Sequence, residues 1–161
     1  MITKTDELYL FWQTDSNLSN WTHTPFVYKG YTIPNSEIAL MYEKAILMGD
    51  NEMAETIIVC GSPKIAKGLG RKVKNFDYEV WEPKRKDIMI DIAVEKALQH
   101  KPTFNELKDT GDRVIAEASP YDKIWGIGFA PNDPKALDMA NWNGSNDLGF
   151  SWMEARNRIF D

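Results

Sequence analysis

The sequence contains one cysteine, two histidines and no long apolar run. Cys60 has no partner for a disulfide within the chain, which fits the reducing cytoplasm where we expect the protein to act. His23 and His100 add too few ligands for a structural zinc site, so we expect no metal and no other cofactor. No stretch approaches the roughly 20 apolar residues of a membrane helix, and the first residues lack the apolar core of a secretory signal. We therefore expect a protein without a membrane segment.

Signature motifs of several large enzyme classes are also missing. The sequence has no Walker loop, no Rossmann fingerprint and no His-Glu-x-x-His motif. A Ser-His-Asp triad would have to use His23 or His100, and neither stands in a recognisable context. These absences argue against nucleotide-triphosphate hydrolysis, dehydrogenation and metalloprotease chemistry. The net charge of -5 argues against broad binding to phosphate backbones, although it leaves room for a small basic pocket on an acidic surface.

The remaining composition is that of an ordinary globular protein. The chain has 161 residues, of which 43% are hydrophobic and 27% charged. No repeat, low-complexity tract or linker divides it, so we expect one domain over residues 1–161. Strands are predicted at 7–12, 26–32 (bent at Gly30), 113–118 and 124–129. Helices are predicted at 36–48, 51–59, 62–72, 83–99, 103–108 and 148–159, with a small helix starting at 133. The patterns favour an α+β fold: a single compact, mostly helical domain with a few short strands.

The predicted helix at 36–48 carries the most informative residues. It reads Ser-Glu-Ile-Ala-Leu-Met-Tyr-Glu-Lys-Ala from Ser36, with Asn35 or Ser36 as its cap. Glu37 and Lys44 lie roughly 10 Å apart along the axis, on nearly the same face. An acid and an amine that converge on a sugar-sized ligand could perform acid/base or covalent chemistry at a carbon next to oxygen. The alternative is two ordinary surface charges at the edge of a core-facing stripe.

The predicted helix at 83–99 and the glycine-containing segment before it carry cationic side chains that could bind an anion. Arg85 and Lys96 line up with apolar residues, which favours long side chains that reach past a core edge into water. The competing reading is that the forked guanidinium of Arg85 binds a phosphate. Arg71, in Gly-Leu-Gly-Arg-Lys, is a second candidate for an anion. The helix is expected to begin after Trp81, and Thr103 to cap the next one.

Two acids and a tryptophan follow in residues 110–128. Glu117 ends a short apolar strand, and Asp122 lies in the turn before Trp125. Acids at strand ends and adjacent turns are where sites are often built. Gly126 and Gly128 would allow a ligand to approach the backbone closely. The alternative is that Asp122 forms the turn and Glu117 is a paired strand residue.

The motif at 36–45 resembles the helix motif of the NADAR family, also called YbiA-like proteins. Trp21 stands where phenylalanine is common in the family, and we expect this difference to affect only packing. Ile38 replaces a usual histidine. No single motif is diagnostic, whereas the order and spacing of all of them are specific. Further matching segments occur at 11–12, 18–21, 66–71, 81–89, 96, 110–112, 117, 122–128, 142–149 and 156.

The resemblance implies an N-glycosidase that cuts the bond between ribose C1′ and a nitrogen. One branch of the family removes ADP-ribose from guanine in nucleic acid, and another acts on phosphoribosylamino-pyrimidine intermediates of riboflavin synthesis. A third possibility is a binding module for ADP-ribose-like ligands, which would need no acid–amine pair. We favour ADP-ribosylated nucleic acid or nucleoside as the substrate, ahead of a small phosphoribosyl compound, and expect no stable protein partner.

The resemblance also implies roles for individual residues. Glu37 would stabilise the transition state or activate water, and Asp122 or Glu117 would take the remaining acid/base role. Lys44 would hold the sugar as a cation or attack C1′ as a Schiff-base nucleophile. Arg71 and Arg85 would hold phosphate, and Trp81 or Trp125 would stack on the base. The implied substrate-binding set is Asn20, Arg71, Trp81, Arg85, Trp125, Gly126 and Asn146.

Overall fold

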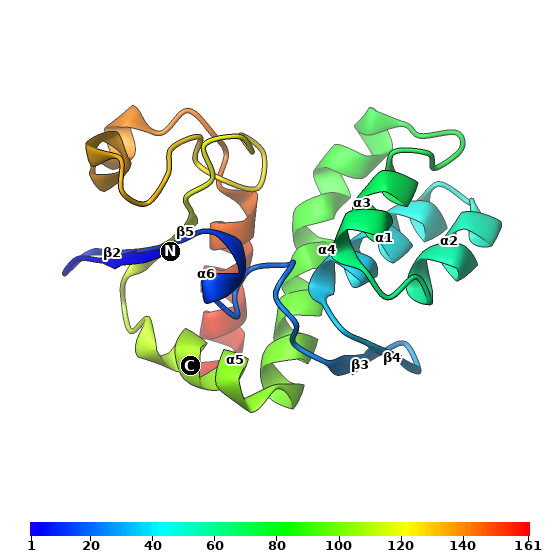
Figure 1. Cartoon of the computed structure of the whole chain (residues 1–161), viewed down its shortest axis with the longest axis horizontal. Coiled ribbons are helices and arrows are strands. Elements are labelled where there is room, and N and C mark those ends of the chain that lie inside the picture. Colours follow the sequence, from blue (N-terminus) through cyan, green and yellow to red (C-terminus); the bar gives the residue numbers. More distant parts are fainter.

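The computed structural model describes residues 1–161 and has two long helices at its centre. Helices α4 (Tyr78–Gln99) and α6 (Asp147–Phe160) lie side by side (Figure 1). On one side pack α1 (Ser36–Leu47), α2 (Asn51–Ile58) and α3 (Pro63–Gly70). On the other side lie α5 (Lys101–Asp109) and a small sheet. This is the predicted compact, mostly helical α+β fold. None of the helices combines the length and apolar character needed to cross a bilayer.

The three-stranded sheet has the order β1-β2-β5. Strand β1 (Ile2–Lys4) is antiparallel to β2 (Leu8–Phe11), and β5 (Val114–Glu117) is parallel to β2. All of β2 is buried, because one face of the sheet packs on the main core and the other on a smaller apolar cluster. The register places Glu117 opposite Phe11, at the end of the sheet. The strands predicted at 7–12 and 113–118 are therefore confirmed.

A hairpin of β3 (Phe26–Tyr28) and β4 (Tyr31–Ile33) precedes the first helix. Both turn residues have left-handed backbones, with φ of 51° at Lys29 and 86° at Gly30. Two positive φ values suit the twist of a two-residue hairpin, and the bend predicted at Gly30 is confirmed.

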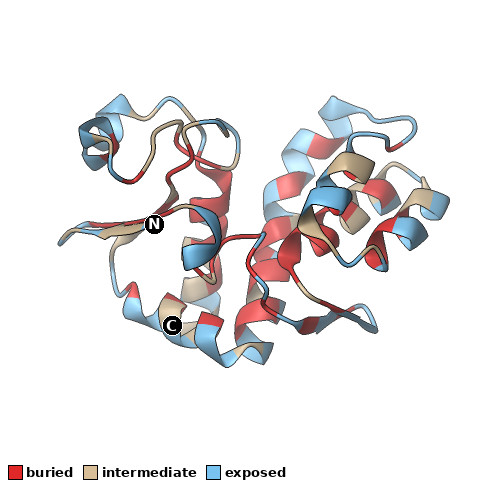
Figure 2. Cartoon of the chain, in the orientation of Figure 1, coloured by how far each residue is buried: buried red, intermediate tan, exposed pale blue.

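Local capping signals set most helix starts. The side chain of Asn35 accepts a hydrogen bond from the Ile38 N–H, and Ser62 does the same for α3. Figure 2 shows buried and exposed residues interspersed along α4 and α6, as expected for helices with one side toward a core. Helix α1 packs against α4 in that core.

Two helix starts differ from the prediction. Helix α4 begins at Tyr78, not after Trp81, because Asp77 caps it by accepting from the Glu79 N–H. Pro83 is tolerated inside the helix because it lies near the N-terminus, on an exposed part of the helix. Helix α5 is capped by His100, whose Nδ1 accepts from the Thr103 N–H at 3.3 Å, so the prediction of Thr103 as its cap was wrong.

Residues 124–129 do not form the predicted strand. They belong to a long irregular loop between β5 and α6, in which short 3-10 helices occupy Pro134–Leu137 and Met139–Asn141. The backbone of Ile127 donates to the Glu117 carbonyl at 2.9 Å and accepts from the Asn143 N–H at 3.1 Å. The loop therefore pairs mainly with itself, and it folds back against the end of β5.

Candidate active site

Glu37 occupies the first turn of α1 and is only 7% exposed. Lys44, from the same helix, is half-buried. The two side chains form no ion pair with each other, yet their charges interact: Lys44 lowers the pKa of Glu37, and Glu37 raises that of Lys44. The larger influence on Lys44 is burial, which lowers its pKa. A lowered pKa gives an amine a larger neutral, nucleophilic fraction.

Burial also dominates the titration of Glu37. Removal from water raises the pKa of Glu37 to about 7, and the charge of Asp122 acts in the same direction. Lys67, Lys44 and Arg71 oppose the rise. The N-terminal end of a helix favours a carboxylate as well. The effect of desolvation is larger than the opposing effects of the three cations and the helix end, so Glu37 titrates near neutral pH.

Glu117 carries the second carboxyl of the site on a half-buried residue. Its Oε2 is enclosed and has no hydrogen-bond partner. Burial raises the pKa of Glu117 to about 8, and the charges of Asp122 and Glu37 raise it further, against Lys67. Glu37 and Glu117 thus lie close enough to influence each other, and neither is neutralised by an ion pair. Such unpaired, perturbed carboxyls mark functional sites more often than structural ones.

Asn146 fixes the strand that carries Glu117. Its Nδ2 donates to the Ile115 carbonyl at 3.0 Å, and its Oδ1 accepts from the Glu117 N–H at 3.2 Å. The residue is fully buried and has a left-handed backbone with φ of 54°. Its amide group is therefore engaged within the protein, and we assign it to positioning Glu117 in place of the predicted substrate contact.

Asp122 and Gly126 shape the loop beside Glu117. The Oδ1 of Asp122 accepts from the N–H groups of Ile124 at 2.9 Å and Trp125 at 2.8 Å, so this acid does form the turn. A Cβ on Gly126 would lie 2.8 Å from the carbonyl oxygens of both Glu117 and Asp122. Glycine is thus required here by the packing of the loop. Trp125 is half-buried against the core, and its stacking role stays a prediction.

The first turn of α1 is tied to the preceding loop by buried polar contacts. The Glu37 N–H donates to the Asn20 carbonyl at 3.0 Å, and Ser36 Oγ donates to Asn20 Oδ1 at 2.8 Å. Lys96 Nζ joins this network by donating to Ser36 Oγ at 3.2 Å and to the Ser19 carbonyl at 3.1 Å. Asn20 and Lys96 therefore hold the backbone that carries Glu37.

Lys96 was expected to reach past the core edge into water, and the structure contradicts this. The residue is 0% exposed, and its Nζ lies 5.5 Å from the centroid of the Trp152 ring. Burial lowers the pKa of Lys96 to about 7, with Glu106 exerting a smaller opposite effect. The loop that supplies the Ser19 carbonyl covers the ammonium group, which the helical pattern alone did not reveal.

The other predicted substrate contacts differ in accessibility. Arg85 is buried and its Nε donates to Asp147 at 2.9 Å, so a phosphate would have to compete with that ion pair. Arg71 is exposed and its charge acts on Glu37, which leaves it free to bind an anion. Trp81 is 6% exposed within α4.

The sequence reasoning missed Lys67 as a site residue. Its charge acts on both Glu37 and Glu117, and its Nζ lies 5.9 Å from the centroid of the Trp21 ring. Trp21 is 39% exposed, and the expectation that it affects only packing stays a prediction. Lys67 stood within the matching segment at 66–71, which was the available signal.

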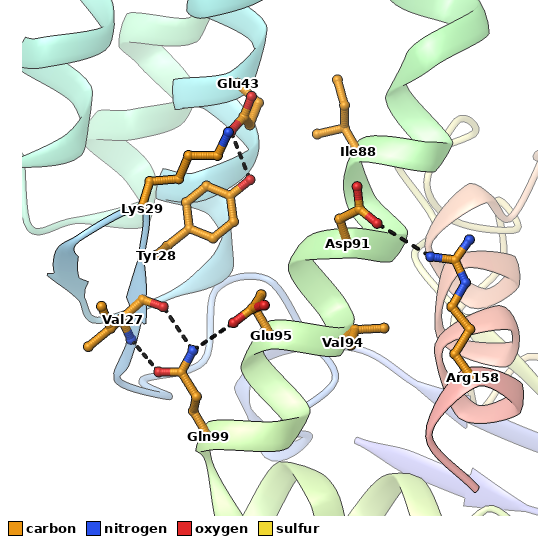
Figure 3. Close-up of a pocket in the computed structure, with 10 residues that line it drawn as sticks. All are labelled: Val27, Tyr28, Lys29, Glu43, Ile88, Asp91, Val94, Glu95, Gln99 and Arg158. Carbon is orange, nitrogen blue, oxygen red and sulfur yellow. Dashed lines mark hydrogen bonds and ion pairs between the residues drawn. The ribbon is translucent and has the colours of Figure 1, made fainter. Parts of the chain in front are cut away.

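A cavity between other elements lies away from these carboxyls. It has a volume of about 660 Å³ and opens between β3, α1, α4 and α6 (Figure 3). Its polar groups satisfy one another: Tyr28 donates to Glu43 at 2.8 Å, and Arg158 pairs with Asp91 at 3.3 Å. None of the predicted site residues lines it. It offers no unpaired acid beside an amine, and the candidate site therefore stays with Glu37 and Glu117.

The fold is a compact, mostly helical α+β domain, and two carboxyls with raised pKa values lie within it. The chain belongs to the NADAR family, whose domain it matches over residues 10–160. The NMR structure of the E. coli protein YbiA superposes with a TM-score of 0.78 at 25% identity, covering 98% of this chain and 87% of that one.

Three relatives show how far the likeness extends. Protein irg-1 of Caenorhabditis elegans is 41% identical over 116 residues, which is 71% of this chain but only 55% of irg-1. An N-glycosidase of Acanthamoeba polyphaga mimivirus is 35% identical over 122 residues, 76% of this chain and 72% of the viral protein. A riboflavin biosynthesis protein of Vibrio vulnificus is 27% identical over 92% of this chain, which spans 38% of that protein.

Proposed function

We propose that this protein hydrolyses a ribose C1′–N bond and that its substrate is ADP-ribosylated guanine in nucleic acid. Membership of the NADAR family, with a relative named N-glycosidase, supports a hydrolase that acts on N-glycosyl bonds. The single cysteine fits the cytoplasm in which we propose that residues 1–161 act as one domain.

The observation that carries the proposal is the pair of buried, unpaired carboxyls. Burial raises the pKa of Glu37 to about 7 and that of Glu117 to about 8, so near pH 7.5 the most populated state of the pair has one carboxyl ionised and the other protonated. Cleavage of a ribosyl C–N bond builds positive charge on C1′ and the ring oxygen, which a carboxylate stabilises. The departing nitrogen takes a proton from the protonated carboxyl. Water then adds its hydroxyl to C1′, and its remaining proton returns to the carboxyl that protonated the leaving nitrogen.

Lys44 has two roles that its half-burial permits. As a cation it would bind the ribose hydroxyls or a phosphate. As a neutral amine it would attack C1′ of the opened sugar and form a Schiff base as the bond from C1′ to the base nitrogen breaks and that nitrogen leaves with a proton. Water would then hydrolyse the Schiff base to the free sugar and the lysine amine. The lowered pKa of Lys44 serves the second role.

A second candidate substrate is a phosphoribosylamino-pyrimidine of riboflavin synthesis. The name of the Vibrio vulnificus relative favours it. The same carboxyl pair would serve, because the bond that breaks is again ribose C1′ to nitrogen.

A substrate comparison by mass spectrometry tests the proposal. An oligonucleotide with ADP-ribosylated guanine and the phosphoribosylamino-pyrimidine are incubated separately with wild type, Glu37→Gln and Lys44→Ala. The control is Glu43→Gln, which changes another half-buried acid of α1 that faces the large cavity.

We expect wild type and Glu43→Gln to release free ADP-ribose, and Glu37→Gln to lose most of that activity. Turnover confined to the pyrimidine would select the second candidate. Binding of ADP-ribose without turnover of either compound would overturn the enzymatic proposal in favour of a binding module.

A further inference from the structure

The chain is acidic as a whole, but one of its segments has an excess of positive charge. Residues 64–86 contain eight lysine and arginine residues against three acids, whereas the rest of the chain contains 11 against 21. These residues form α3, the loop after it and the first turns of α4. All the cations of this segment except Arg85 are exposed. We call residues 64–86 the cationic surface.

The exposed cations of this surface are not neutralised by the protein. The ion pairs of the structure join other residues, apart from the buried pair of Arg85 with Asp147. An ordinary solvated helix face usually mixes both signs of charge and pairs some of them. An excess of unpaired cations, eight against three acids, on an otherwise acidic protein favours an anionic partner.

Exposed aromatic rings accompany these cations. Phe76 and Tyr78, within the cationic surface, are 44% and 50% exposed, and Trp21 beside it is 39% exposed. Lys44 Nζ lies 4.6 Å from the centroid of the Phe76 ring, and Lys67 Nζ lies 5.9 Å from that of Trp21. Cations beside partly exposed aromatic rings are the parts that bind single-stranded nucleic acid, through phosphates and stacked bases respectively.

The cationic surface is continuous with the active site. Lys67 and Arg71 belong to it, and their charges act on the carboxyl of Glu37. In Figure 1 the loop after α3 and the start of α4 lie on the upper side of the molecule, as does the loop that follows β5, which belongs to the other half. A strand held on the surface could therefore present a modified base to Glu37 and Glu117.

We infer that the cationic surface binds the single-stranded nucleic acid that flanks the modified base. This inference rests on the proposed function and extends it from a base to a polynucleotide. Lysines hold the phosphates of the flanking nucleotides, and the exposed rings stack on their bases. A duplex keeps its bases paired and stacked internally, so it engages the lysines only.

Fluorescence anisotropy with a labelled, unmodified single strand of about 12 nucleotides tests the surface without any catalysis. The test variant is the triple change Lys72→Glu, Lys74→Glu and Lys84→Glu, which avoids every residue assigned to the site. The matched control carries the same charge change away from the surface, at exposed positions of β1 and α5: Lys4→Glu, Lys101→Glu and Lys108→Glu.

The wild type should bind with log K falling against log salt at a slope of about −3 if about four phosphates are contacted. The triple variant should bind at least about tenfold more weakly, and its slope should become shallower by about 2, to about −1. The control should bind like wild type. An abasic strand and a duplex of equal length should both bind more weakly than the intact strand. Equal losses in the triple variant and its control, or an abasic strand that binds as tightly as the intact one, would overturn the inference.

Cleavage assays separate this inference from the proposed function. The triple variant should keep wild-type kcat/KM on ADP-ribosylated guanosine and lose it on the modified oligonucleotide, mainly through KM. If wild type cleaves neither compound, the proposed function fails while the anisotropy result still decides the surface. If the triple variant cleaves the oligonucleotide as well as wild type does, the surface has no part in substrate binding.

Discussion

The pH dependence of kcat/KM follows from the two buried carboxyls, Glu37 and Glu117. Activity should rise as Glu37 ionises near pH 7 and fall as Glu117 loses its proton near pH 8. For pKa values of 7 and 8, the singly protonated pair amounts to roughly 60% at pH 7.5 and about 3% at pH 5.5 or 9.5. We therefore expect a bell-shaped profile that falls roughly 20-fold on each side.

Glu117→Gln should remove the alkaline limb and keep the acid limb near pH 7. The acid limb persists because burial is the main cause of the raised pKa of Glu37. The maximal kcat/KM of this variant should fall by about 10²–10⁴, the usual contribution of one acid/base group. The assay is initial-rate product release by mass spectrometry from pH 5.5 to 9.5 at constant ionic strength.

Glu43→Gln is the control for this experiment, because it removes a carboxyl of the same helix that faces the large cavity. Its profile should match wild type. A wild-type profile that is flat from pH 6 to 9, or an alkaline limb that survives in Glu117→Gln, would refute the assignment of the two carboxyls.

Three further changes probe the supports of the site. Because burial lowers the pKa of Lys96 from 10.5 to about 7, the unfolded chain binds more protons between these pH values and stability should rise with pH across them. Lys96→Met should abolish this rise, as measured by urea unfolding at several pH values; an unchanged pH slope would contradict the buried cation. Asn146→Ala removes two hydrogen bonds and should lower the free energy of unfolding by about 3 kcal/mol, with kcat reduced more than KM; wild-type stability would refute its positioning role. Borohydride should trap a sugar adduct on wild type and not on Lys44→Ala, and an adduct on both would exclude Lys44 as the nucleophile.

Local signals in the sequence were sufficient to predict the helix that carries Glu37. Asn35 supplies a cap, the apolar residues repeat at helical spacing, and Gly49 ends the helix with φ of 77°. The same spacing put Glu37 and Lys44 on one face. Each of these features depends on neighbours within a few residues, which is why they could be recognised without the fold.

The prediction of a strand at 124–129 was wrong because the hydrogen-bond partners of this segment come from other parts of the chain. The segment is apolar and lies next to β5 in the chain, yet Gly126 packs against the carbonyls of Glu117 and Asp122. That close approach bends the chain away from a regular ladder. Partners such as Asn143, far along the sequence, then satisfy its backbone.

For Lys96 and Lys67, too, the surroundings of the side chain could not be predicted from neighbouring residues in the sequence. A lysine in line with apolar residues reads as a rim residue, and only the loop that carries Ser19 makes Lys96 a buried one. Lys67 lies on an exposed helix face, and its proximity to Glu37 and Glu117 arises from the packing of α3 beside α1. Burial and electrostatic neighbours depend on which distant segments meet.

Product analysis of an oligonucleotide with ADP-ribosylated guanine addresses the role of the buried carboxyl most directly. Wild type and Glu43→Gln should release ADP-ribose and unmodified oligonucleotide in equal amounts, while Glu37→Gln should release them at least about 10²-fold more slowly. Release by Glu37→Gln at the wild-type rate would contradict a catalytic role for this carboxyl.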